Sequence, residues 1–281
     1  MFQMGEFQLF SLDTGRFALD GGAMFGVVPK NLWNKTNPAD EQNRIELALR
    51  CLLIKGKDKN ILIDTGIGEK LDEKLKNIYK VDHSQNTLEK SLAEVGLLNE
   101  DITDVIISHL HFDHTGGTTF EKNGELLPTF PNATHHIQKE HWDWAISPAE
   151  KDIASFIKDN FSVIEKSGKL NLLDGPQELY PAIEILVLYG HTLGMQAVKI
   201  SNGNNTLLYC ADLIPTASHI PIPWVMAYDN NPLITIEEKK RLLPRAVKEN
   251  WILFFEHDPF RAAGTVQQTD RGYSLNEDIV I

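Results

Sequence analysis

Short apolar runs, separated by turn residues, are the feature that most limits how this chain can fold. Eight segments rich in Ile, Val and Leu lie between Gly, Asn and Asp residues, a pattern that is typical of buried strands. They cover residues 45–56, 60–66, 102–109, 133–138, 183–191, 195–201, 205–212 and 251–258. Helical patterns fall between them, and this alternation indicates a layered α/β fold.

Two of the helical segments carry recognisable start signals. One is expected to begin at Asn86, where Glu89 three residues later completes a capping-box pattern. Another is expected near Thr235, with Glu238 in the same relation, and Pro244 should then kink or interrupt that helix.

Composition favours one soluble domain. The 281 residues are 42% hydrophobic, and no linker, repeat or low-complexity segment divides them, so we expect a single domain over 1–281. No apolar run reaches the roughly 18 residues of a membrane helix, and the first residues lack the pattern of a secretory signal. A cytoplasmic location is expected, with Cys51 and Cys210 as buried thiols in a reducing compartment.

The net charge of -12 bears on possible partners. Phosphate backbones and anionic membrane surfaces are bound by clustered Lys and Arg, which this chain lacks. A small-molecule substrate is therefore favoured over nucleic acid or membrane.

Acidic residues and histidines close several of the predicted strands. Asp64, His109, His191, Asp212 and His257 each follow an apolar run. Because α/β folds place ligands at the carboxyl ends of their strands, these five endings predict a single polar cluster.

The segment "SHLHFDHTGG" at 108–117 supplies further polar side chains. Residues two apart in an extended or loop backbone point the same way, so His109 and His111 can share an ion, while Asp113 and His114 face a neighbouring position. Gly116 and Gly117 would let the chain turn sharply away. Four ligands from one loop exceed what one catalytic ion with an open position needs, which favours two ions.

Strand-end residues can complete two such sites: His191 for the first ion, His257 for the second, and Asp212 as a carboxylate that bridges both. Nitrogen and oxygen ligands without thiolate suit zinc, and iron, manganese and cobalt are also compatible. A solvated His-rich loop is the alternative for "HLHFDH" taken alone. His83, His135, His136 and His141 follow no such pattern and are expected at the surface or in ordinary hydrogen bonds.

These motifs resemble the metallo-β-lactamase fold superfamily. Its "HxHxDH" motif, later His, Asp and final His match "HLHFDH" (109–114), "GHT" (190–192), "CAD" (210–212) and "EHD" (256–258), and "LIDTG" (62–66) is similar to its strand turn. The resemblance covers about residues 45 to 260. It implies a four-layer αββα sandwich with a dinuclear site at one edge.

The resemblance also implies a distribution of ligands. His109, His111 and His191 would hold one ion, Asp113, His114 and His257 the other, and Asp212 would bridge them, with Asp64 orienting a histidine ligand. The best-known subclass of β-lactamases carries Cys at the position of Asp212, which argues against β-lactam hydrolysis here.

Within the superfamily, the segments 20–35 and 211–229 are similar to the N-acyl homoserine lactonases and the related methyl parathion hydrolases. One lactonase branch places a substrate-binding Tyr just after the bridging Asp, where this chain has "LIPT" (213–216). His219 or Tyr228 could take that role, and Asp113 or His219 could pass a proton to the leaving alkoxide.

Two apolar loops are the candidate wall for an acyl chain. One contains Met24, Phe25 and Trp33, and the other contains Trp224 and Met226 together with Ile220, Ile222 and Tyr228. Core packing or a homodimer interface would explain these loops equally well. Trp142 and Trp144 are expected to pack on a helix.

The leading hypothesis is a two-metal hydrolase that opens lactone rings by attack of a metal-bridging hydroxide. A phosphotriesterase acting on organophosphates could use the same site. An iron oxidoreductase of the same fold is a third hypothesis, which oxygen uptake would favour. The complete ligand set argues against a catalytically silent interaction protein.

Overall fold

The computed structural model describes residues 1–281, which divide into two compact units. Unit 1 comprises Met1–Gly15 and Leu49–Gly175, and unit 2 comprises Arg16–Ala48 and Pro176–Ile281. Two of the three boundaries fall inside the long strands β2 (Phe7–Asp20) and β3 (Arg44–Lys55), and the third lies between Gly175 and Pro176. Neither unit is a continuous stretch of chain, and the single domain over 1–281 stays a prediction.

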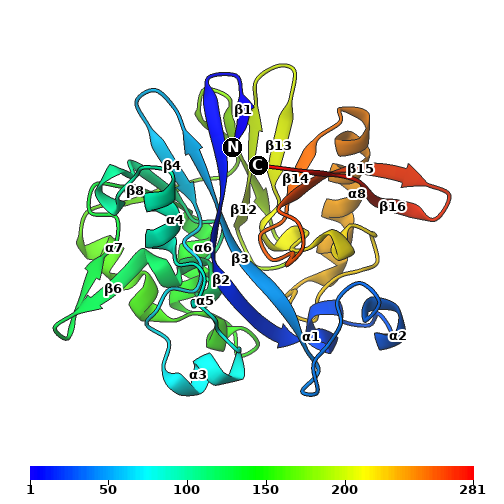
Figure 1. Ribbon diagram of the computed structural model, residues 1–281, viewed down its shortest axis with the longest axis horizontal. Helices are drawn as coiled ribbons and strands as arrows, with labels where there is room; N and C mark the ends of the chain where they lie inside the picture. The colour runs from blue at the N-terminus through cyan, green and yellow to red at the C-terminus, as the bar shows by residue number, and fades with distance from the viewer. The chain divides into compact units, whose positions relative to one another are not determined.

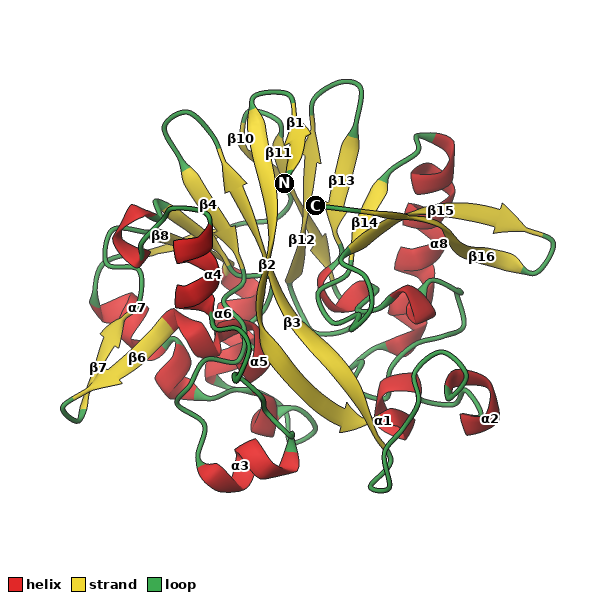
Figure 2. Cartoon of the chain, in the orientation of Figure 1, coloured by secondary structure: helices red, strands yellow, loops and turns green.

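The first seven-stranded sheet has the order β1-β2-β3-β4-β5-β8-β9. Figure 2 shows β2 and β3 as its long strands. Strand β4 pairs antiparallel with β3, whereas β4, β5, β8 and β9 are parallel neighbours. Parallel strands are typically buried on both faces, which suits the apolar residues of the central strands β4 and β5. The bounds not yet given are β1 Phe2–Met4, β4 Asn60–Ile63, β5 Asp104–Ile106, β8 Thr134–Gln138 and β9 Leu170–Leu173.

Short helices and one hairpin complete unit 1 (Figure 1). Helix α6 packs on β8 and β9, where Trp142 joins Leu62, Val105 and Ile137 in the core. The elements are α3 Glu73–Ile78, α4 Leu88–Glu94, α5 Phe112–Thr115, α6 Lys139–Ile146, α7 Ser162–Lys166, and the hairpin strands β6 Thr119–Lys122 and β7 Glu125–Pro128.

The second seven-stranded sheet lies within unit 2 and has its strands in chain order, β10 to β16. All neighbours are antiparallel except β13 and β14, and helix α8 packs on β15. The strands are β10 Gln177–Tyr180, β11 Ile183–Leu188, β12 Met195–Ser201, β13 Thr206–Tyr209, β14 Ile252–Phe254, β15 Ala263–Thr269 and β16 Gly272–Ile279. The helices are α1 Gly21–Phe25, α2 Lys30–Trp33 and α8 Pro232–Lys248.

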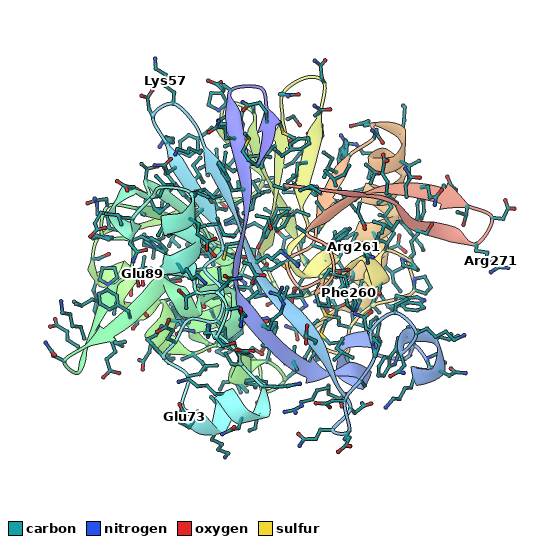
Figure 3. All side chains as sticks on the ribbon, viewed as in Figure 1. Lys57, Glu73, Glu89, Phe260, Arg261 and Arg271 are labelled. Carbon is teal, nitrogen blue, oxygen red and sulfur yellow. The ribbon has the colours of Figure 1, made fainter.

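Charged residues mark the turns at the sheet ends. Figure 3 shows Lys57 at the turn between β3 and β4 and Arg271 at the turn between β15 and β16, both with side chains directed outward. Such residues suit exposed hairpin tips because they keep their hydration.

All eight predicted strand segments contain a strand, and the predicted α/β class is confirmed by two large mixed sheets with helices. The helix start expected at Asn86 is wrong by one residue, since Thr87 Oγ1 accepts the Lys90 N–H at 3.2 Å. The capping box expected at Thr235 is also wrong, because α8 begins at Pro232.

Helix α8 continues past Pro244 to Lys248, so the expected interruption is wrong. Pro244 lies on the exposed side of the helix, where water can bind the carbonyl that a proline leaves unbonded. None of the helices combines the length and apolarity that crossing a bilayer requires. Cys51 and Cys210 are buried free thiols, as expected.

Candidate metal centre

Four of the predicted ligands, His109, His111, Asp113 and His114, form a first ligand group in unit 1. They follow β5, and His111 is the residue from which the short helix α5 begins. The carbonyl of His111 accepts the N–H groups of His114 and Thr115 at 3.1 and 3.2 Å, which fixes this turn. Asp113 and His114 therefore project from helical backbone rather than from the extended loop that the sequence predicted.

The first ligand group is buried and close-packed. None of its members is more than 7% exposed, and the His109 ring centroid lies 4.4 Å from that of His111 and 4.0 Å from that of His114. The Asp113 Oδ2 atom lies 3.8 Å from His114 Nε2. The structure thus brings all four side chains together within unit 1.

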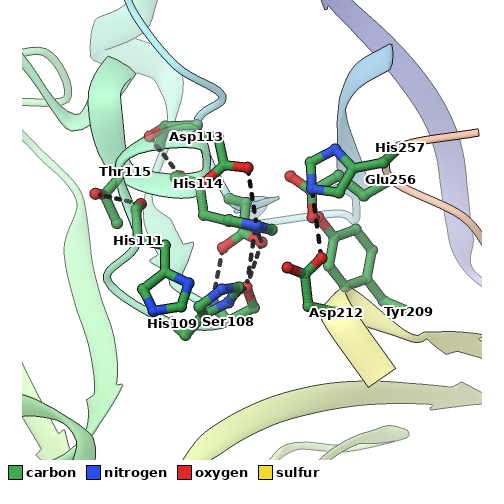
Figure 4. A network of polar contacts seen from close by, with 12 residues as sticks. Ser108, His109, His111, Asp113, His114, Thr115, Tyr209, Asp212, Glu256 and His257 are labelled. Carbon is green, nitrogen blue, oxygen red and sulfur yellow. Dashed lines mark hydrogen bonds and ion pairs between the residues drawn. The ribbon is translucent and has the colours of Figure 1, made fainter. Parts of the chain in front are cut away.

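Hydrogen bonds at Nδ1 orient two of these imidazoles (Figure 4). His109 Nδ1 lies 3.0 Å from Ser108 Oγ, and His114 Nδ1 lies 3.1 Å from Asp64 Oδ2. Ser108 donates its N–H and its Oγ–H to Asp64 at 2.6 and 2.5 Å, which holds the carboxylate in place. Asp64 contacts a histidine of this group, as the sequence analysis expected, and Nδ1 contacts of this kind direct the Nε2 lone pair toward a ligand.

Gly116 and Gly117 lie in the tight 3-10 turn Gly116–Thr118, and both also allow a neighbouring loop to approach closely. Gly116 has ordinary helical backbone angles, but an added Cβ would overlap the Ile67 carbonyl, and one on Gly117 would overlap the Thr65 carbonyl. The Thr65 N–H donates to the His114 carbonyl at 2.9 Å. The two glycines therefore allow the loop after β4, which carries Asp64, to lie against the ligand loop.

Histidines outside the ligand motif are more buried than expected. His135 and His141 are 0% exposed and His136 is 3% exposed, so a surface location is wrong for all three. His136 makes ordinary hydrogen bonds to Asp104 and Asn171, each at 2.9 Å. His141 Nε2 accepts the Leu110 N–H at 2.7 Å and thereby fixes the backbone between His109 and His111.

The remaining predicted ligands, His191, Asp212 and His257, form a second ligand group in unit 2. They follow β11, β13 and β14, and they are 1%, 7% and 2% exposed. The two oxygens of Asp212 face different histidines, since Oδ2 lies 3.2 Å from His191 Nε2 and Oδ1 lies 3.4 Å from His257 Nε2. Figure 4 shows the Asp212 carboxylate turned toward His257.

Both histidines of the second group are also held at Nδ1. His257 Nδ1 donates to the Ala48 carbonyl at 2.9 Å, and His191 Nδ1 lies 3.0 Å from Asp229 Oδ1. A ring whose Nδ1 carries the proton presents an unprotonated Nε2, the atom that here faces Asp212. His109 and His114 of the first ligand group are likewise held at Nδ1.

The donor set fits a divalent metal. Its five imidazoles and two carboxylates are all buried. Buried carboxylates are expensive to desolvate, and a cation offsets that cost. Nitrogen and oxygen donors with Nδ1 contacts behind them are the usual environment of zinc and similar ions in proteins.

His219 has the contacts of a packing residue. It is 1% exposed, its ring stacks on Phe25 at 4.6 Å, and both ring nitrogens are bound: Nδ1 lies 2.8 Å from Thr216 Oγ1 and Nε2 lies 2.8 Å from the Met24 carbonyl. Burial lowers the pKa of His219 to about 4, so the ring is neutral near pH 7. These contacts leave no hydrogen of the ring directed toward a substrate.

The candidate substrate residues lie in unit 2, mostly inside it. Met24, Phe25, Trp33 and Met226 are at most 4% exposed, and Phe25 stacks on Trp33 at 5.3 Å. Trp224, which contacts Phe25 edge-on at 5.7 Å, and Tyr228 are half-buried. Contact of any of them with a substrate stays a prediction. In unit 1, Trp142 and Trp144 lie on α6 as expected.

Ser108 and Asp229 are the supporting residues that the sequence analysis missed. Asp229 lies 38 residues beyond the histidine that it contacts, and no local pattern marks such a pair. Ser108 could have been found as the hydroxyl residue next to the first His of the motif.

Comparisons with known proteins agree on one family. The family model described as the metallo-beta-lactamase superfamily matches residues 47–260. An N-acyl homoserine lactonase of Bacillus cereus is 26% identical over 265 residues, which cover 89% of this chain and 93% of that protein.

Two solved structures are similar over nearly the whole chain. A probable metal-dependent hydrolase from Staphylococcus aureus has a TM-score of 0.87 and 32% identity, covering 99% of this chain and 100% of that one. AidC, a dizinc quorum-quenching lactonase in complex with its product, has a TM-score of 0.83 and 27% identity, covering 100% and 97%.

Proposed function

Because the chain belongs to the metallo-beta-lactamase superfamily, we propose that it is a two-metal hydrolase that opens the lactone ring of N-acyl homoserine lactones. It has the fold of that superfamily and is similar to metal-dependent hydrolases, among them lactonases. The substrate is proposed from those lactonases. A cytoplasmic location is part of the proposal, in keeping with two free thiols.

The observation that carries the proposal is the common orientation of four imidazoles. His109, His114, His191 and His257 each have Nδ1 bound to a protein group, which leaves Nε2 as the atom available for coordination. A structural histidine has no need of this arrangement, as His219 illustrates with both nitrogens bound to the protein.

We assign the ligands as the sequence motif suggests. His109, His111 and His191 would hold one ion, Asp113, His114 and His257 would hold the other, and Asp212 would supply a carboxylate oxygen to each. The position of Asp212 within the second ligand group supports the bridging role, since its two oxygens face different histidines. Zinc is the proposed metal, with iron, manganese and cobalt compatible with the same donors.

When bound, two divalent ions activate water near neutral pH and polarise the carbonyl of an ester. The residues of the chain supply orientation and proton transfer. Asp64 and Asp229 keep His114 and His191 in the required tautomer. We assign proton transfer to the leaving oxygen to Asp113 in preference to His219, because the His219 ring is neutral and fully hydrogen-bonded.

Substrate contacts are assigned by exposure. Trp224 and Tyr228 are half-buried and have exposed surface that an acyl chain or a lactone oxygen can contact. We therefore assign substrate contact to these two residues before the others. Phe25 contacts both Trp33 and Trp224 and so supports this wall, and we assign the buried Met24 and Met226 to the same wall. A homodimer through these loops is the alternative use, and the burial of Phe25 and Trp33 within unit 2 favours packing instead.

A substrate panel tests the proposal. Purified protein is assayed on acyl homoserine lactones of increasing chain length and on methyl parathion, with metal analysis of the same preparation. We expect ring opening to exceed phosphotriester hydrolysis, and Asp212→Ala and His111→Ala to lose bound metal and turnover together. Retained turnover in either metal-depleted variant, or a preference for methyl parathion, would overturn the assignment; oxygen uptake with bound iron would indicate an oxidoreductase.

A further inference from the structure

Helix α8 buries two adjacent residues of opposite charge, Glu238 and Lys239. They are 5% and 0% exposed, whereas their neighbours Glu237 and Lys240 form an exposed surface ion pair at 2.8 Å. Neither buried residue belongs to the proposed ligand set. Each binds backbone groups of a different loop of unit 2.

Glu238 binds the turn that leads into His191. Its carboxylate accepts the N–H groups of Tyr189 and Gly190 at 2.6 and 3.3 Å, directly before that histidine. Gly190 itself lies against the first turns of α8, because an added Cβ would overlap Thr235. Burial raises the pKa of the Glu238 carboxyl, while the two backbone donors oppose that shift.

Lys239 binds the loop at residues 219–224, on the chain segment that continues to Asp229. Its ammonium donates to the carbonyls of His219, Pro221 and Trp224 at 2.6, 2.7 and 3.0 Å. Three carbonyls take up all three ammonium hydrogens. A single side chain therefore binds three backbone carbonyls of the loop that carries Trp224.

Both anchored segments lead to His191. Asp229 Oδ1 lies 3.0 Å from His191 Nδ1, and Asp229 Oδ2 accepts the Met226 N–H at 3.3 Å, two residues after Trp224. The Asn230 N–H donates to the His191 carbonyl at 2.9 Å, and the Asn231 N–H donates to the Gly190 carbonyl at 2.8 Å. The backbone and the ring of His191 are thus held by the two loops that α8 anchors.

Stability alone explains this pair poorly. Two buried charges that each bind backbone rather than one another carry a desolvation cost, and apolar residues of similar volume are often as stabilising in such places. Charged groups differ from apolar ones in making directional hydrogen bonds, and one carboxylate or ammonium can fix several backbone groups at once.

We propose that Glu238 and Lys239 are positioning residues that set the geometry of the metal ligand His191 and of the substrate loop at 219–229. This inference rests on the ligand set of the proposed function. Glu238 acts through the Tyr189–Gly190 turn, and Lys239 acts through the loop that carries Trp224 and leads to Asp229.

The test uses Glu238→Gln and Lys239→Met in the full chain, with zinc affinity measured by competition with a chelator. Glutamine keeps only one acceptor for the two N–H groups, and methionine keeps the length of lysine without its donors. We expect zinc affinity to fall about tenfold in each, in line with the loss of groups that orient a ligand. For Lys239→Met we also expect a rise in KM for acyl lactones larger than the fall in kcat.

The exposed neighbours give the matched controls. Glu237→Gln and Lys240→Met remove charge from the same helix turn and should leave zinc affinity and KM unchanged. If the neutral variants do not fold, Glu238→Asp and Lys239→Arg carry the test, since they keep the charge but change its reach, and the same direction of change is expected.

The outcomes separate this inference from the proposed function. Folded variants at positions 238 and 239 with the zinc affinity and KM of the wild type would overturn the positioning role. A wild-type protein that binds zinc but opens no lactone would overturn the proposed substrate and leave the positioning role intact if the variants still bind zinc more weakly. A wild-type protein without zinc affinity would overturn both.

Discussion

Four of the proposed ligand imidazoles are each held by a contact at Nδ1. Ser108 is adjacent in sequence to the histidine that it contacts. The other three contacting groups, Asp64, Asp229 and the Ala48 carbonyl, lie far in sequence from their histidines. Such contacts fix the tautomer and the rotation of a ring, and they raise its basicity toward a metal. Metal affinity should therefore depend on residues that do not touch the metal.

The first prediction concerns Asp64. Asp64→Asn leaves the size of the side chain unchanged but removes the charge that Ser108 and His114 share. We expect metal affinity to fall by about tenfold to a hundredfold, with the fold retained. Competition with a chelator measures the loss of metal affinity. The control is Asp143→Asn, which changes an exposed carboxylate that forms an ion pair with Lys139. Equal affinities in the two variants would contradict this role for Asp64.

The residues of the two ligand groups were predictable because several of them follow strands and the others belong to the short motif that begins at His109. Sequence reasoning could not reach Asp229, nor the neutral, fully bonded state of His219, because both depend on contacts between residues far apart in the chain. The burial of the aromatic residues around Phe25 likewise depends on packing and not on local sequence.

At the scale of elements, the apolar strands were predictable and several others were not. Strand β2 mixes polar and apolar residues over 14 positions, and the C-terminal hairpin of β15 and β16 is largely polar, so neither gives a strong strand pattern. Helix ends were misplaced where two candidate caps adjoin, as at Asn86 and Thr87. The choice between such neighbours depends on backbone geometry, which the sequence does not display.

The second prediction tests that helix start. Thr87→Ala removes the side-chain oxygen that accepts the Lys90 N–H, and the free energy of unfolding should fall by about 1 kcal/mol. Asn86→Ala should change it by less than about 0.5 kcal/mol, as expected for a position without a cap contact. Urea unfolding of both variants decides between the two caps, and a larger loss at position 86 would show that the helix begins there.

At the scale of the whole molecule, stability should depend on pH through buried histidines outside the ligand groups. His135 lies in β8 with neither ring nitrogen hydrogen-bonded, and burial lowers its pKa to about 4 from an ordinary value of 6.5. Between these two pH values the unfolded chain binds a proton that the folded chain does not bind. The free energy of unfolding therefore falls as the pH drops from 6.5 to 4 and is insensitive to this group above 6.5.

The third prediction follows from that difference. His135→Met removes the titrating group and the unpartnered nitrogens, so the variant should be more stable than the wild type. Its advantage should grow by about 3 kcal/mol between pH 6.5 and pH 4, because one unit of pKa shift corresponds to about 1.4 kcal/mol. Unfolding measured for both proteins across this range checks it, and a constant difference would refute the assigned pKa.

The most direct measurement is a zinc titration of chelator-stripped protein, with bound zinc per chain and hydrolysis of N-hexanoyl homoserine lactone followed on the same samples. We expect stripping to abolish ring opening and two zinc ions per chain to restore it. Full turnover by the stripped protein, or two bound ions without any opening of the lactone, would contradict the proposed two-metal lactonase.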